Sequence, residues 1–214
     1  MARRRSDWRL YAPPAYAAEL PRDIVRRYPF ATLVSSDPSG RPFLTQTPIY
    51  FASDADDEPC LVGHLARNNP HADQLTDNGL AVAHFTGPHA YVSASWYVER
   101  PTVPTWNYVS AQVRGRISVI DDREGQRGVL ERVIALSEEF SGSNWTMNDA
   151  PDGRVEALLP HIRSFRLEIE SIAGVTKLSQ THPVSDRLRV ADALETRNSD
   201  DDAAIAAMIR SIRS

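Results

Sequence analysis

The feature that most constrains the fold is a series of short alternating strands separated by turn residues. Residues 30–35 read FATLVS, residues 42–51 read PFLTQTPIYF, and residues 37–40 between them (DPSG) have the composition of a β-turn. Two strands joined by so short a turn form an antiparallel hairpin. The chain has no strict alternation of strands and helices and no GxGxxG or phosphate-loop motif, which argues against a doubly wound nucleotide-binding fold.

The rest of the chain continues this pattern. Further strands are predicted at 60–65, 80–86, 90–95, 105–120 and 162–175, and helices at 21–28, 69–76, 123–139, 153–159, 184–196 and 201–212. The Gly-Pro-His segment at 87–89 separates two of these strands, and Gly115 bends the longest one. Six or seven antiparallel strands with peripheral helices predict a mainly β fold, arranged as a small barrel.

Composition limits the functions that the chain could have. The net charge is −4, and residues 3–5 (Arg-Arg-Arg) form the only basic cluster, so nothing in the overall charge attracts nucleic acid. No apolar run approaches the length of a membrane span, and the charged start lacks the apolar stretch of a secretory signal. The single cysteine, Cys60, fits a reducing cytoplasm and is read as a core residue.

Residues 63–70 (GHLARNNP) form the first candidate site. A strand ends there, Arg67 follows, and Asn69 with Pro70 has the pattern of a helix start. The amides at a helix N-terminus together with a guanidinium can hold a phosphate. A helix cap beside a surface arginine explains the same residues equally well.

Residues 103–116 (VPTWNYVSAQVRGR) form the second candidate site. Trp106, Asn107 and Tyr108 place two flat rings and an amide at the beginning of the long strand. That chemistry suits a planar, hydrogen-bonding ligand such as a flavin, or a partner subunit. A buried aromatic cluster at a corner of the barrel is the alternative.

Three further segments carry polar side chains at unusual places. Residues 45–49 (TQTPI) put Pro48 inside a strand, which indicates an edge or a gap in the sheet. Residues 87–97 (GPHAYVSASWY) bring His89 close to three aromatic residues. Residues 177–183 (KLSQTHP) include Lys177, the only lysine in a chain with 24 lysines and arginines.

These motifs together resemble the PaiB-type negative transcriptional regulators. HLARNNP, GPHAYVSASWY, VPTWNY and KLSQ occur in the order and at the spacing typical of that family, and YPFATLVS at 28–35 is similar too. The resemblance covers residues 8 to 210. The family usually has KLSQNRP where this chain has Thr181 and His182 at the Asn and Arg positions, which puts any ligand contact of that loop in doubt.

The resemblance implies a split β-barrel of the FMN-binding type. It implies a homodimer with FMN in a groove between the subunits, and it divides the chain into a barrel domain at 1–180 and a C-terminal helical extension at 181–214, packed on the barrel or on the dimer partner. Thr45, Gln46 and Thr47 would lie beside the flavin ring, and Trp106, Asn107 and Tyr108 of the second subunit would cover it. The ribityl-phosphate would face Gly63, His64, Ala66, Arg67 and Asn69, and the KLSQ motif adds Lys177 and Gln180.

Function remains open among three hypotheses. The first is a cytoplasmic FMN-binding repressor of transcription with DNA or a regulatory protein as partner, although no helix-turn-helix stands out. The second is a flavin-dependent oxidoreductase acting on a small metabolite, for which His64 and His89 are the candidate acid or base groups. The third is a dimeric interaction protein with a degenerate flavin site. The spacing of the six histidines does not favour a haem or metal ligand set.

Overall fold

The chain forms two compact units. The computed structural model describes residues 10–98, 103–197 and 199–212. What we call the barrel unit contains residues 25–85 and 112–172, and what we call the helical unit contains the described parts of 1–24, 86–111 and 173–214. The basic cluster at residues 3–5 lies outside the described residues. The predicted division into residues 1–180 and 181–214 stays a prediction.

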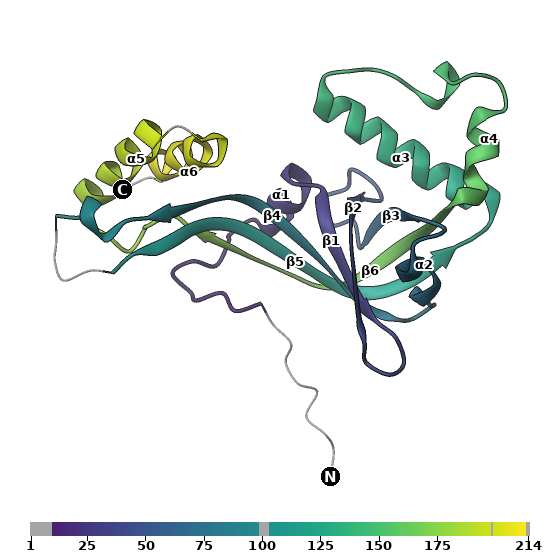
Figure 1. Cartoon of the computed structure of the whole chain (residues 1–214), viewed down its shortest axis with the longest axis horizontal. Helices are drawn as coiled ribbons and strands as arrows, with labels where there is room; N and C mark the ends of the chain where they lie inside the picture. Colours follow the sequence, from purple (N-terminus) through teal and green to yellow (C-terminus); the bar gives the residue numbers. More distant parts are fainter. Residues whose placement is uncertain (1–9, 99–102, 198, 213–214) are drawn as a thin grey trace, which may run out of the picture. The chain divides into compact units, whose positions relative to one another are not determined.

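Six strands close into a barrel in the order β1-β2-β3-β6-β5-β4 (Figure 1). Strand β1 runs antiparallel to its neighbours β2 and β4. Strand β3 likewise runs antiparallel to its neighbours β2 and β6. The strands are β1 Phe30–Ser36, β2 Pro42–Phe51, β3 Cys60–Ala66, β4 Leu80–Val92, β5 Thr105–Ile120 and β6 Ile162–Lys177. The prediction of a mainly β antiparallel barrel with peripheral helices is confirmed.

The predicted hairpin forms with the expected turn. Phe30 pairs with Pro48 and Ser36 with Pro42, which leaves residues 37–41 to reverse the chain. The carboxylate of Asp37 accepts hydrogen bonds from the backbone N–H groups of Ser39 and Arg41, each at 2.9 Å. Together with the Ser39 hydroxyl, these donors hold the pKa of Asp37 below its usual value. Asp at the start of a turn therefore closes it, as its chemistry predicts.

One predicted boundary was wrong. Gly87, Pro88 and His89 do not separate two strands, because β4 continues through them to Val92. The register between β1 and β4 covers residues 82–84 of β4, so Pro88 lies beyond it. Pro88 therefore removes no ladder hydrogen bond to β1, while β5 borders the other edge of β4. Ala94 and Ser95, predicted as the last residues of the strand at 90–95, lie instead in a short 3-10 helix, Ala94–Trp96.

The interior of the barrel is filled by apolar side chains from every strand. The largest fully buried ones in this unit are Leu33, Ile49, Leu61, Leu65, Leu75, Phe85, Ile117, Leu159, Phe165 and Leu167. Helix α3 (Arg123–Ser141) covers β2 and β3, where its Val129 and Val133 pack on Tyr50 and Val62. Among the described residues, four short helical segments complete the barrel unit's periphery: α2 (Pro70–Gln74), α4 (Arg154–Leu158) and the 3-10 turns Met147–Asp149 and Leu159–His161. Helix α1 (Pro21–Arg27) precedes β1.

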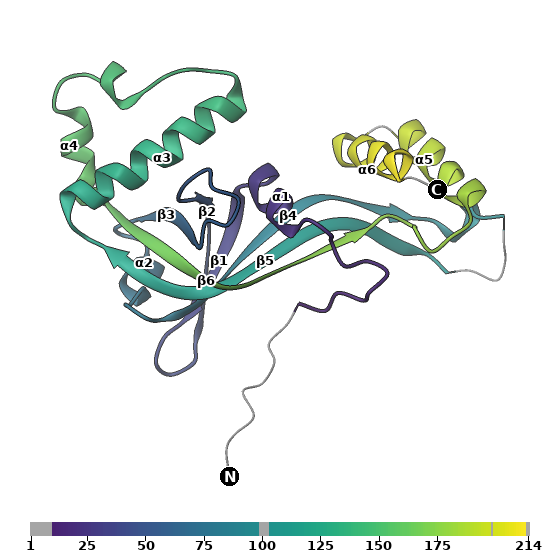
Figure 2. The same cartoon turned by 180° about the vertical axis from the view of Figure 1, so that it is seen from behind.

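In the helical unit, α5 (Val184–Arg197) and α6 (Asp200–Ser211) lie side by side (Figure 2). Their buried faces carry Val190, Ala191, Leu194, Ile205, Ala206 and Ile209. Arg210 of α6 bridges to Asp192 at 2.5 Å and to Glu195 at 2.9 Å on α5. Both helices occur where the sequence predicts them. Their apolar faces pack together, and ion pairs at the edge of this contact add to the pairing.

Gly115 is required by a close approach of two strands. A Cβ atom built there would lie 1.9 Å from the carbonyl oxygen of Glu168, so we expect Gly115→Ala to lower the free energy of unfolding by at least about 3 kcal/mol. The matched control is Gly128→Ala in α3, where a Cβ meets nothing within 4 Å. That variant should gain about 0.5–1 kcal/mol, because alanine is the better helix former. Urea unfolding of both variants measures the difference, and equal stabilities would contradict the close approach.

Candidate functional site

The residues predicted for ligand binding fall into two groups, one in each unit. The barrel unit contains Thr45, Gln46, Thr47, Gly63, His64, Ala66, Arg67 and Asn69. The helical unit contains Trp106, Asn107, Tyr108, Lys177 and Gln180. The two groups are considered separately below, and their joint role stays a prediction.

A hydrogen-bond network fixes the segment that follows β3. Asn69 caps α2, because its Oδ1 accepts from the N–H of His71 at 2.9 Å, and its Nδ2 donates to Thr45 Oγ1 at 3.0 Å. The His71 ring lies between two hydroxyls, with Nδ1 2.9 Å from Thr45 Oγ1 and Nε2 2.8 Å from Ser35 Oγ. The sequence analysis missed His71; its place directly after the capped Asn69-Pro70 start was the available signal.

The predicted site residues on β2 and β3 have different surroundings. Thr47 is buried and donates its hydroxyl proton to the carbonyl oxygen of His64 at 2.7 Å, whereas Gln46 is exposed. A Cβ at Gly63 would lie 2.8 Å from Phe165 Cζ, so the packing of Phe165 already requires glycine there. Within the part of the chain that the structure describes, the buried Nδ1 of His64 has no hydrogen-bond partner. A ligand or an ordered water can satisfy such a nitrogen, but His64 does not line the hollow at Arg67.

Arg67 lines a hollow of about 390 Å³ at the end of β3. Its Nη1 lies 2.7 Å from Asp121 Oδ1, and Arg163 approaches the other carboxylate oxygen of Asp121 at 3.4 Å. The hollow is lined by Arg67, Asp121, Arg123, Gln126, Leu159, Pro160 and Ile162. Two arginines and one carboxylate on its walls leave an excess of positive charge, which suits an anion. Sequence reasoning missed Asp121 and Arg123 because they are more than 50 residues from Arg67.

The leading amides of α2 are mostly engaged. Pro70 has no N–H, the N–H of His71 binds the Asn69 side chain, and the N–H of Ala72 binds the Asn69 carbonyl oxygen at 2.8 Å. The helix is only five residues long. The arginine side chains, rather than helix amides, are therefore the groups available here for an anion.

The Trp-Asn-Tyr triplet does not present one face. Trp106 is 53 % exposed, with the ring of Tyr91 edge-on at 5.8 Å and the ring of His89 at 6.0 Å. Asn107 is fully buried and donates to Ser179 Oγ at 3.0 Å. Successive side chains of a strand point to opposite sides. The amide therefore anchors the 177–183 loop, and the aromatic surface is formed by Trp106 with Tyr91.

The loop at 177–183 uses its polar side chains to hold its own shape. Lys177 Nζ donates to Thr105 Oγ1 at 2.5 Å and lies over the ring of Tyr16. Gln180 Oε1 accepts from the N–H of Leu178 at 2.6 Å, and its Nε2 donates to the Thr176 carbonyl oxygen at 2.6 Å. These bonds support the left-handed backbone of Ser179 (φ 60°).

The two residues that depart from the family pattern also have partners in this unit. Thr181 Oγ1 lies 3.1 Å from the hydroxyl of Tyr16, and His182 stacks on Tyr97 with the ring centroids 4.4 Å apart. Both replacements are thus accommodated by aromatic neighbours.

The described residues contain no group of three or more His, Cys, Asp or Glu side chains arranged to hold a metal ion. Among the same residues, no helix is long and apolar enough to cross a membrane.

The closed six-stranded antiparallel barrel places the chain in the class of small β-barrel domains. The chain belongs to the family described as "Putative FMN-binding domain", whose model matches residues 10–171. It is 30% identical over 176 residues to the "Protease synthase and sporulation protein PAI 2" of Bacillus subtilis, covering 81% of this chain and 82% of that protein. The predicted membership of the PaiB-type family is confirmed.

Solved structures show the same fold. A conserved hypothetical protein from Mycobacterium tuberculosis superposes with a TM-score of 0.56 at 12% identity, covering 81% of this chain and 94% of that one. The FAD and haem binding protein of Mycobacterium smegmatis superposes with a TM-score of 0.51 at 17% identity, covering 73% and 69% of the two chains. The predicted split-barrel class is thereby confirmed.

Burial of His64 and His71 makes stability depend on pH. Desolvation lowers the pKa of both imidazoles below 6.5, so the unfolded chain binds more protons below that pH. We expect the free energy of unfolding to be largest above pH about 6.5 and to fall as the pH decreases, by at most about 1.4 kcal/mol per pH unit for each histidine.

Urea unfolding between pH 7 and pH 5, roughly the window where histidine titrates, measures this slope. His64→Gln and His71→Gln should each reduce this slope. A slope that is the same in the parent protein and in both variants would contradict the assignment.

Proposed function

We propose that the chain is a cytoplasmic, FMN-binding negative regulator of transcription that works as a homodimer. The observation that carries the proposal is the hollow at the end of β3, where Arg67 and Arg123 outnumber the single carboxylate of Asp121. It lies within the matched residues 10–171 of an FMN-binding family.

The residues present in the barrel unit fit the anionic end of FMN. The guanidinium of Arg67 is only half buried, and its partner Asp121 is also held by Arg163, so Arg67 can turn to a phosphate without leaving Asp121 unpaired. A charge-assisted pair of this kind is among the stronger contacts available to a phosphate.

The proposed role of the aromatic group requires a second copy. In the dimer that the resemblance implies, Trp106 and Tyr91 of one copy would cover the flavin ring bound by the other. Trp106 has the required exposure, and large amphipathic rings are favoured both at subunit interfaces and against planar ligands.

When bound, FMN supplies redox chemistry, and the protein supplies position and hydrogen bonds. A regulator would use this to read the redox or ligand state of the cell. Because the net charge is −4, we infer that regulation acts through a protein partner or through a local basic surface rather than through overall attraction to DNA.

Three measurements separate the candidate functions. Visible flavin absorption in the purified protein supports FMN binding, and its absence after reconstitution favours the interaction protein without cofactor. Bleaching of that absorption by NAD(P)H favours the oxidoreductase. Retention of genomic DNA fragments that collapses steeply with salt favours direct repression.

Arg67→Ala should lower the affinity for FMN by about 1–3 kcal/mol, because a charge-assisted hydrogen bond to phosphate is lost. Its affinity for riboflavin, which has no phosphate, should stay that of the parent protein. Titrations followed by flavin fluorescence measure both. Arg127→Ala is the matched control, since Arg127 is an exposed arginine of the same unit that pairs with Glu131 and Glu156. Equal losses for FMN and riboflavin would remove Arg67 from the phosphate site.

Trp106→Ala should weaken dimerisation and flavin binding together, since the proposed dimer buries this ring against the cofactor. We expect about 2 kcal/mol for each, the usual scale for a central aromatic interface residue. Sedimentation velocity and FMN titration measure the two effects. Trp145→Ala, at an exposed tryptophan of the barrel unit, is the control. A Trp106→Ala protein that dimerises and binds FMN normally would refute this placement.

A further inference from the structure

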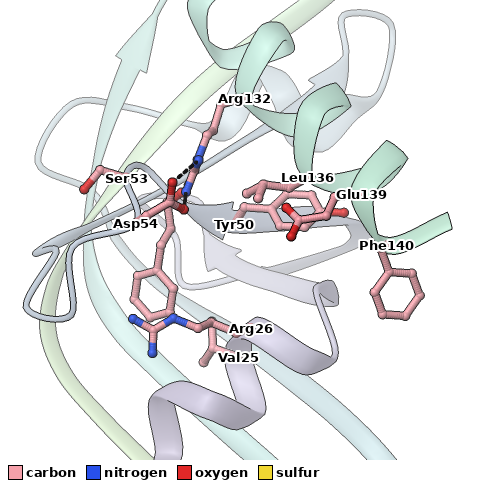
Figure 3. Close-up of a pocket in the computed structure, with 10 residues that line it drawn as sticks. Val25, Arg26, Tyr50, Ser53, Asp54, Arg132, Leu136, Glu139 and Phe140 are labelled. Carbon is pink, nitrogen blue, oxygen red and sulfur yellow. Dashed lines mark hydrogen bonds and ion pairs between the residues drawn. The ribbon is translucent and has the colours of Figure 1, made fainter. Parts of the chain in front are cut away.

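A second hollow, of about 380 Å³, opens on the barrel unit between the last turn of α1, the end of β2 and the C-terminal half of α3 (Figure 3). It is lined by Val25, Arg26, Tyr50, Phe51, Ser53, Asp54, Arg132, Leu136, Glu139 and Phe140. None of these residues lines the hollow at Arg67. The proposed flavin site therefore does not account for it.

Hydrogen bonds hold the walls of this second hollow in place. Arg132 reaches from α3 to the end of β2, where its Nε donates to the Phe51 carbonyl oxygen at 3.0 Å and its Nη2 lies 2.6 Å from Asp54 Oδ1. The hydroxyl of Tyr50 lies 2.8 Å from Ser137 Oγ, which in turn donates to the carbonyl oxygen of Val133. A site whose walls are already ordered loses less entropy when it binds a ligand.

Apolar and aromatic side chains form most of the surface. Tyr50 and Phe51 are buried at the end of β2, and Leu136 and Phe140 extend from α3 (Figure 3). Phe140 is 72 % exposed, so its ring is accessible to a ligand in this hollow. An aromatic ring at the rim of a preformed hollow suits a ligand with an apolar body.

The charges on the walls select the sign of the ligand. Both arginines face carboxylates, since Arg132 binds Asp54 and Arg26 lies 3.4 Å from Asp56 while its guanidinium stacks on Phe51. Among the residues that the structure describes, no hydrogen-bond or ion-pair partner is seen for the carboxylate of Glu139. Asp54 and Asp56, which pair with these two arginines, come from the acidic loop at 54–58 (DADDE). The charge left without a partner is therefore the negative charge of Glu139.

We propose that this hollow binds a small organic cation, namely a protonated amine with an aromatic or branched apolar body. The body packs on Tyr50, Leu136 and Phe140, and the ammonium group lies at Glu139. Ammonium groups also bind favourably to the faces of aromatic rings. The inference depends on this hollow alone and stands or falls independently of flavin binding.

Isothermal titration of the full chain with 2-phenylethylammonium tests the proposal. Two probes of similar shape are its controls, the neutral 2-phenylethanol and the anionic 3-phenylpropionate. We expect saturable binding of the amine, and at least about fivefold weaker binding of the alcohol and the acid, the scale of one exposed ion pair.

Two variants of α3 and two matched controls locate the binding. Glu139→Gln should weaken amine binding about fivefold and leave the alcohol unaffected, whereas Glu138→Gln, one residue away and not on the wall, should change neither. Phe140→Ala should weaken amine binding about tenfold, because the ring loses both apolar contact and its attraction for the cation. Leu158→Ala, at another exposed apolar position, should not. All four variants should bind FMN as the parent does.

Three results would each overturn the proposal. They are equal binding of the amine and the alcohol, an unchanged amine affinity in both Glu139→Gln and Phe140→Ala, and no saturation below about 10 mM amine, beyond which binding carries little specificity.

Discussion

The position of the candidate anion site depends on the hydrogen bonds around His71. This ring connects a hydroxyl of β1, Ser35, with a hydroxyl of β2, Thr45, while its own backbone N–H is capped by Asn69. The residues from Ala66 to Pro70 are thereby tied to two strands on one side, and Arg67 leaves this segment toward Asp121 on the other. A guanidinium is useful for recognising an anion only when its backbone is fixed, because a mobile side chain loses entropy with every contact.

Burial of the His71 imidazole makes its protonation unfavourable and so makes this hydrogen-bond network sensitive to pH. The imidazole of His71 is almost completely enclosed, with Phe43 stacked on it, and desolvation lowers its pKa. Its neutral form can satisfy both hydroxyls whichever nitrogen carries the proton, since a hydroxyl donates or accepts. The chain of hydroxyl, imidazole and hydroxyl therefore links β1 to β2 with either tautomer of His71. Because the ring is neutral, no charge is buried.

Local chemistry was enough to predict most of the fold from the sequence. The hairpin at 30–51 follows from the alternation of apolar and polar residues and from the hydrogen bonds that Asp37 accepts in the turn. Helix caps and apolar helix faces could likewise be predicted from the sequence. The error at Gly87-Pro88-His89 arose because the effect of a proline in a strand depends on whether a neighbour pairs with it there, and pairing is a property of the closed barrel. The requirement for glycine at position 115 could not be predicted for the same reason, because it comes from the close approach of the Glu168 backbone in the closed barrel.

The candidate site was predicted less completely. Residues 63–69 were identified because strand end, arginine and helix cap are adjacent in sequence, whereas Asp121 and Arg123 join them only through the fold. Asn107 shows the opposite difficulty: its neighbours Trp106 and Tyr108 suggested a shared face, but strand geometry turns its amide inward to Ser179. Sequence proximity is a poor guide wherever the side chains of a strand alternate.

Helix α3 is a common wall of two hollows. Its first turns carry Arg123 and Gln126 toward Arg67, and its later turns carry Arg132, Leu136, Glu139 and Phe140 to the cavity beside β2. An α-helix of 19 residues is stiff along its axis and spans about 28 Å. A substitution that displaces this helix would therefore alter both hollows at once, although they share no lining residue.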